Sequence, residues 1–146
     1  MSFTIDANIL LYAVNKDSVF HPQAKAFIES CAESDKIWYL FWPVIHAFIR
    51  ISTHPKIMPV PLTSAEAVSI IQQLLDLPNV QTIGDNEPIF WAIYKAEIET
   101  GHLRGNQISD ALIVSIMKAN GIGTIYSRDR DFLRFKGIKV IDPILS

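Results

Sequence analysis

The stretch that decides the fold is Ser2-Phe3-Thr4-Ile5-Asp6-Ala7-Asn8-Ile9-Leu10. Its first residues form a short run with high strand propensity, which stops at Asp6, and the apolar residues that follow take up helical spacing. A strand that leads directly into a helix is typical of α/β folds, in which ligands bind outside the carboxyl ends of the strands. Asp6 is therefore expected at the ligand-binding edge of a sheet.

Two further aspartates occupy comparable places. Asp110 lies at the amino end of an apolar helix, and Asp129 follows the buried-strand signal Thr124-Ile125-Tyr126. If the strands are neighbours, three carboxylates converge, and their repulsion opposes ionisation unless a cation is present. A hard divalent cation with oxygen ligands is the expected remedy. Taken singly, each acid is also explained as a helix cap or a turn former, Asp129 most readily.

Strands alternate with helices along the rest of the chain. Strands are predicted at about residues 2–5, 37–40, 80–83, 124–126 and 138–141, and helices at about 8–13, 21–34, 43–52, 64–77, 87–100 and 107–120, with a helical turn at 129–135. Thr63 and Glu66 have the spacing of a capping box, and Asn86 is the expected cap of the fifth helix. The alternation predicts a three-layer α/β/α sandwich around a central, mainly parallel sheet, formed by residues 1–146 as one domain.

Composition narrows the function classes. The formal charge of −2 gives no overall attraction to nucleic acid, so any such contact must be local or assisted by a metal. Cys31 is the only cysteine, which excludes an internal disulfide and disfavours a thiolate zinc site. No apolar stretch has the length of a membrane span, and the amino-terminal residues lack signal-peptide features, so we expect a cytoplasmic protein.

Several short segments carry a resemblance to a known family by their order and spacing. They are Ile5-Asp6-Ala7-Asn8-Ile9-Leu10-Leu11-Tyr12-Ala13, Trp42-Pro43-Val44-Ile45 with Phe48-Ile49-Arg50, Thr53-His54-Pro55, Arg104-Gly105-Asn106, Ser109-Asp110-Ala111-Leu112 and Ser127-Arg128-Asp129-Arg130-Asp131-Phe132. Together they resemble the PIN domains, particularly the VapC-type toxin ribonucleases of toxin–antitoxin systems. The family fold is a small α/β/α sandwich around a parallel sheet, in agreement with the predicted elements.

The resemblance implies cleavage of RNA phosphodiester bonds with Mg²⁺ or Mn²⁺, leaving 5′-phosphate and 3′-hydroxyl ends. Asp6 and Asp110 match the metal-binding acids of the family, and Asp129 matches the acid of its final strand-loop motif. These three are the expected catalytic and metal-binding residues. Asp131 aligns with the second, more variable acid of that loop.

One departure from the family pattern lies in the third helix. Many PIN domains have a glutamate three residues before the position of Arg50, where this chain has Ala47, and no acid occurs from residue 37 to residue 56. Fewer carboxylates weaken metal affinity, or leave one strong site instead of two. The adjacent His46 either packs beside Trp42 or bonds a backbone carbonyl, or it replaces the missing ligand and tilts the site toward Mn²⁺.

Other side chains are expected to assist the acids. Asn8 and Ser109 tune the surroundings of the metal, unless Asn8 is simply a helix cap. Arg50 either meets substrate phosphates or pairs with a carboxylate, and Arg104 and Arg128 either share that role or are solvated. The aromatic residues that suggest base stacking are expected to pack mostly in the core; they are Trp38, Trp42, Phe90, Trp91 and Tyr94.

The leading hypothesis is a metal-dependent endoribonuclease toxin that acts on a structured RNA such as a transfer RNA. The implied partners are this RNA and a cognate antitoxin protein, with a homodimer expected from apolar residues on the early helices. One rival is an Asp-based phosphatase with Asp6 as nucleophile, although Asn8 stands where a second aspartate is needed. The other rival is a catalytically silent PIN fold that binds RNA or a protein.

Overall fold

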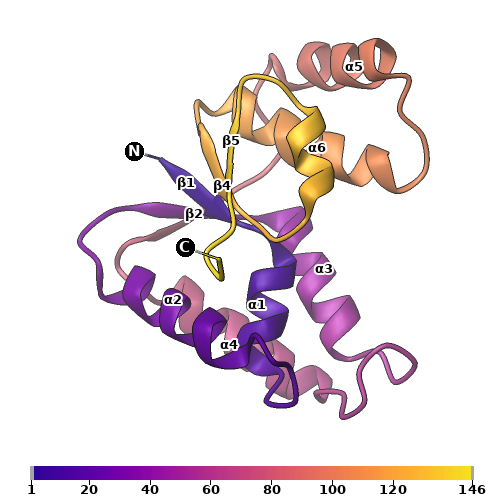
Figure 1. Cartoon of the computed structure of the whole chain (residues 1–146). Coiled ribbons are helices and arrows are strands. Elements are labelled where there is room, and N and C mark those ends of the chain that lie inside the picture. Colours follow the sequence, from indigo (N-terminus) through magenta and orange to yellow (C-terminus); the bar gives the residue numbers. More distant parts are fainter. Residues whose placement is uncertain (1, 146) are drawn as a thin grey trace.

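The five strands form one sheet in which every neighbouring pair is parallel, in the order β3-β2-β1-β4-β5 (Figure 1). This computed structural model describes residues 2–145. The strands are β1 (Phe3–Ile5), β2 (Trp38–Phe41), β3 (Val80–Ile83), β4 (Thr124–Tyr126) and β5 (Lys139–Ile141). The central strand β1 is buried along its whole length, and its neighbours are β2 and β4.

The helices cover both faces of this sheet. They are α1 (Ala7–Val14), α2 (His21–Glu33), α3 (Trp42–Ser52), α4 (Ser64–Leu75), α5 (Phe90–Gly101) and α6 (Asn106–Ala119), followed by the short 3₁₀ helix η1 (Arg130–Arg134). The chain moves from β1 through β2 to β3 in one direction and returns from β3 to β4 in the other. Right-handed crossovers therefore place α1 to α4 on one face and α5 with α6 on the opposite face, as Figure 1 shows. The predicted three-layer sandwich is confirmed.

The core lies between the sheet and both helical layers. Trp38 and Phe41 of β2 are fully buried, as is most of the helical run from residue 113 to residue 117 in α6. Cys31 is buried on α2, as its helical spacing predicts. Two of the aromatic residues expected in the core are not there, because the side chains of Trp42 and Trp91 are 51% and 63% exposed.

The sequence locates some helix ends well and one end badly. Thr63 and Glu66 form the predicted capping box at the start of α4. The prediction of Asn86 as a cap is wrong, since α5 begins at Phe90. The physical reason is Pro88, whose ring disfavours helical geometry at the preceding residue and so prevents the helix from including residues 86 and 87. No helix among residues 2–145 is long and apolar enough to cross a membrane.

The parallel register brings two chain segments together at the carboxyl edge of the sheet. Ile5 of β1 is level with Tyr126 of β4, and the Asp6 amide donates to the Tyr126 carbonyl at 2.9 Å. The amide of Ser127 then donates to Ile141 of β5, also at 2.9 Å. The residues that follow β1 and β4 are therefore neighbours, although 121 positions separate them in the sequence.

Candidate functional site

Asp6 stands at the point where β1 ends and α1 begins. One carboxylate oxygen, Oδ1, accepts a hydrogen bond from the Ala7 amide at 2.7 Å, so Asp6 caps α1. The other, Oδ2, accepts a hydrogen bond from the Ser127 hydroxyl at 2.7 Å. Burial raises the pKa of the Asp6 carboxyl, the two hydrogen bonds oppose that rise, and the charge of Asp129 adds to it.

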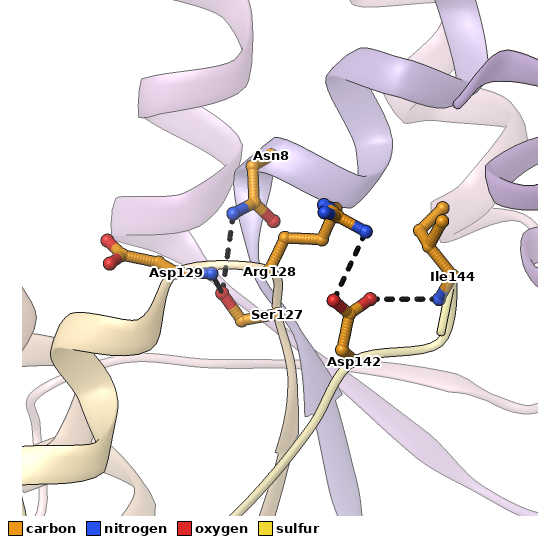
Figure 2. Close-up of polar contacts among 6 residues, drawn as sticks. All are labelled: Asn8, Ser127, Arg128, Asp129, Asp142 and Ile144. Atoms are coloured by element: carbon orange, nitrogen blue, oxygen red, sulfur yellow. Dashed lines mark hydrogen bonds and ion pairs between the residues drawn. The ribbon is translucent and has the colours of Figure 1, made fainter. Parts of the chain in front are cut away.

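The buried hydroxyl of Ser127 holds three parts of the site together. It donates to Asp6 and accepts hydrogen bonds from the Asn8 side-chain amide at 3.3 Å and the Asp129 backbone amide at 2.9 Å (Figure 2). The sequence did not single out Ser127, although its position directly after a strand was the available signal. Asn8 therefore bonds to the residue that holds Asp6, and it does not cap α1, a role that belongs to Asp6.

Three carboxylates form a tight group next to this hydrogen-bonded network. Asp110 comes from the second turn of α6, Asp129 from the loop after β4, and Asp131 from the first turn of η1. One oxygen of each lies within 4.8 Å of the others, and the Asp131 amide donates to Asp129 Oδ1 at 2.9 Å. Asp6 is outside this group. Asp131, which the sequence suggested only as a more variable acid, belongs to the group in its place.

Burial and the repulsion of neighbouring carboxylates both raise the pKa of Asp110. The pKa of Asp110 rises from its ordinary value of 3.8 to about 6, first because the side chain is partly buried. The negative charges of Asp129, Asp6 and Asp131 raise it further, in that order, and Arg134 lowers it. The other three aspartates therefore act on Asp110, and Asp129 acts on Asp6, in line with the predicted convergence of Asp6, Asp110 and Asp129. Arg134 was not foreseen as a site residue.

The donor set fits a hard divalent cation. The oxygens of the three clustered carboxylates are the ligand type that Mg²⁺ and Mn²⁺ prefer. The buried Oδ1 atom of Asn8 accepts no hydrogen bond from any described residue, which suits an amide oxygen that a cation or its water would complete. These residues, with Asp6, are those that would hold a metal.

The remaining candidates lie apart from this arrangement or at its margin. Ser109 precedes Asp110 and is exposed, and Arg50 is exposed in the last turn of α3. His46 is also exposed on α3. Ala47 is half-buried against the hydrophobic core.

Arg128 has a structural role that corrects the expectation of a solvated side chain. It is only 23% exposed, and its guanidinium forms an ion pair with Asp142 at 3.2 Å (Figure 2). Its guanidinium carbon also stands 4.1 Å from the centre of the Phe20 ring. Asp142 also accepts a hydrogen bond from the Ile144 amide at 2.9 Å. Arg128 thus fastens the loop that carries Asp129 to the C-terminal segment and to the turn before α2.

Comparison with known proteins adds independent evidence. Residues 3–138 match the PIN domain family. Ribonuclease VapC48 of Mycobacterium tuberculosis is 38% identical over 143 residues, which cover 98% of each chain. Among solved structures, the sarcin-ricin loop cleaving toxin VapC20 of M. tuberculosis superposes with a TM-score of 0.69 at 15% identity, over 96% of this chain and 99% of the other. VapBC2 of Rickettsia felis superposes with a TM-score of 0.65 at 19% identity, over 96% and 97%.

The repulsion at Asp110 predicts a stabilising substitution in the absence of divalent cations. Since the folded state raises this pKa, its contribution to stability is full below pH 3.8 and is lost as the pH rises through 6. A shift of this size in a buried group is worth roughly 3 kcal/mol, and solvent screening of the half-exposed side chain reduces it to about 1 kcal/mol. Asp110→Asn should raise the melting temperature at pH 7.5 by about 2–4 °C.

Calorimetric melting checks this prediction, with the exposed Asp35→Asn as the matched control. Most of the gain should disappear at pH 4, where the Asp110 carboxyl is neutral in the folded state. Added Mg²⁺ at pH 7.5 should stabilise the wild type more than Asp110→Asn. A variant that melts below the wild type at pH 7.5 in a chelator would contradict the electrostatic interpretation.

The contacts of Arg128 predict a loss of stability when its charge is removed. Arg128→Gln should lower the free energy of unfolding by about 2 kcal/mol, because it leaves Asp142 without this ion pair and removes the contact with Phe20. Lys25→Gln also removes one positive charge, from an exposed pair with Glu29 at 3.9 Å, and should change stability by less than about 0.5 kcal/mol. Urea denaturation measures both, and equal losses would show that Arg128 has no special structural role.

Proposed function

The chain belongs to the PIN-domain family and, within it, to the VapC ribonucleases, and from this premise we propose that it is the toxin of a toxin–antitoxin pair that hydrolyses RNA with a bound divalent cation. One observation carries the proposal. Four aspartates from distant parts of the sequence gather at the carboxyl edge of a parallel sheet, where this fold class binds its ligands. The mutual repulsion of these acids makes a cation the natural occupant.

Some of these side chains would bind the cation, and others orient the carboxylates. Asp110, Asp129 and Asp131 would hold Mg²⁺ or Mn²⁺, with Asn8 Oδ1 and Asp6 on the side of β1. When bound, such an ion polarises a phosphoryl oxygen and lowers the pKa of water. Ser127 keeps Asp6 in one orientation, and the Asp131 amide does the same for Asp129. A carboxylate fixed in this way can align the attacking water with the phosphorus.

We further propose that Asp131 supplies the fourth acid that Ala47 does not. Its oxygen belongs to the tight group, whereas Ala47 packs against the core. A fourth carboxylate from the loop after β4 keeps the charge of the site at the level that the family pattern implies. The arrangement therefore does not require His46 as a ligand. A site with oxygen ligands alone suits Mg²⁺ as well as Mn²⁺.

The proposal includes a cognate antitoxin as a protein partner. The structural relatives include toxins solved with their partners, such as VapBC2 of R. felis, which was bound to a DNA fragment from the promoter of the pair. Large apolar side chains are exposed on the loop after α3, at Ile57 and Val60, and on α4, at Val68. A protein partner or a second copy of the chain would remove such side chains from water.

An Asp-based phosphatase has little support at this site. That chemistry needs a second aspartate two residues after the nucleophile, and the side-chain amide of Asn8 instead donates to Ser127. Both oxygens of Asp6 are also occupied as hydrogen-bond acceptors, which lowers the nucleophilicity of its carboxylate.

A cleavage assay tests the proposal on the purified chain without antitoxin. We expect the wild type to cleave structured RNA with Mg²⁺ or Mn²⁺ and to stop when EDTA is added. Asp110→Asn and Asp129→Asn should each lower the rate by about 100-fold or more, because each removes a charge from the metal site. Asp35→Asn, an exposed acid far along the chain from the cluster, should keep the wild-type rate.

Two outcomes would contradict parts of the proposal. Equal cleavage by the wild type, Asp110→Asn and Asp129→Asn would reject the metal-nuclease assignment, and no cleavage despite RNA binding would favour the silent PIN fold. For Asp131, the readout is Mn²⁺ affinity by titration calorimetry. Unchanged affinity in Asp131→Asn would show that this residue does not replace the family glutamate.

A further inference from the structure

A cavity of about 440 Å³ lies between α5, α6 and the segment after η1. Its walls include Ala96 and Glu97 of α5, Leu103, Lys118 of α6, Arg134 and Lys136. The volume is in the range of sites that bind small organic molecules or single nucleotides, about 300–1,000 Å³. None of these residues takes part in the acidic group described above.

The side chains that line this cavity are mainly positive, whereas the group of Asp110, Asp129 and Asp131 is negative. Three cations line it, and Glu97 is the one carboxylate among its described lining residues. Glu97 forms an ion pair with Lys118, and both side chains are largely buried. Arg134 and Lys136, which are exposed, therefore supply the positive charge that a ligand would meet.

Arg134 connects the cavity to the acids, because it lines the one and its charge acts on Asp110 in the other. Along α6, Lys118 is eight residues beyond Asp110, which corresponds to about 12 Å at the rise of an α-helix. Arg134 is therefore the lining residue within reach of the acids, and Lys118 lies farther from Asp110 along α6. A polymer whose phosphate is held at the acids would place an adjoining residue here.

Resting on the ribonuclease function proposed above, we propose that this cavity binds a nucleotide of the RNA substrate next to the cleaved bond. Its phosphate lies against Arg134 and Lys136, and its ribose and base lie over the apolar floor formed by Leu103 and Phe135. A chain with a net charge of −2 and three clustered aspartates repels RNA, so the cations that line the cavity have to supply the attraction.

Lys136→Gln is the sharpest variant, because Lys136 lines the cavity and is exposed, so folding does not depend on it. Binding of a fluorescent single-stranded RNA is measured by anisotropy in the Asp110→Asn background, which prevents cleavage. We expect affinity to fall by about 3- to 10-fold and the slope of log affinity against log salt to decrease by about 0.7, the loss of one phosphate contact. Lys95→Gln, which removes the same charge from an exposed pair with Glu99 on α5, should change neither.

A steric variant tests the cavity without a change of charge. Ala96→Phe should fill it and weaken RNA binding, whereas Ala92→Phe, exposed one turn earlier on the same helix and not part of the lining, should leave binding intact. In the cleavage assay with the acids intact, Lys136→Gln should raise KM and leave kcat within about twofold, because it acts on binding.

Equal RNA affinity in Lys136→Gln and Lys95→Gln would overturn the proposal. So would a Lys136→Gln variant that keeps its RNA affinity but loses a co-expressed antitoxin, since the cavity would then serve a protein partner. Failure of the ribonuclease function is seen separately, as absence of metal-dependent cleavage by the wild type, and the binding experiment gives its answer in either case.

Discussion

The hydrogen bond from the Ser127 hydroxyl to the Asp6 carboxylate is the contact on which the site depends. It joins the first residue after β1 to the first residue after β4, and this is possible only because the two strands are parallel and in register. The same hydroxyl accepts the amide of Asp129 and the side chain of Asn8. One buried oxygen thus sets the relative positions of two acids and an amide, with little freedom left to any of them.

This arrangement brings negatively charged aspartates close together, so that they repel one another. The two nearby arginines, Arg134 and Arg128, differ in whether their charge acts on these aspartates. Arg134 acts directly on Asp110 and lowers its pKa, while remaining exposed. Arg128 is adjacent to Asp129 in sequence, but its charge is committed to Asp142 and the Phe20 ring. It fixes the backbone of the loop without neutralising the acids. The acids are therefore not neutralised by Arg128, and a bound cation would offset their charge.

The fold and the convergence of the acids were predictable from the sequence, because the acids follow predicted strands or lie near the start of a predicted helix. Asp6 follows a strand and Asp110 opens a helix, and topology alone brings such positions together. Ser127 and Arg134 were missed, because their roles depend on strand register and on side-chain directions that local patterns do not encode. Trp42 was misplaced for a related reason. Its spacing suits a buried helical face, yet the side chain lies at the amino end of α3, where the helical layer no longer covers it.

The overall charge of −2 conceals a strong local asymmetry, and this bears on how such a chain meets a polyanion. Charges are screened over about 8 Å at physiological salt. A phosphate near Asp110 therefore senses the aspartates and Arg134 more than the distant surface. In the proposed mode of binding, successive phosphates would meet opposite local fields at the acidic group and at the basic cavity. Net charge excludes a general nucleic-acid binder, but it does not argue against an enzyme that holds RNA at one bond.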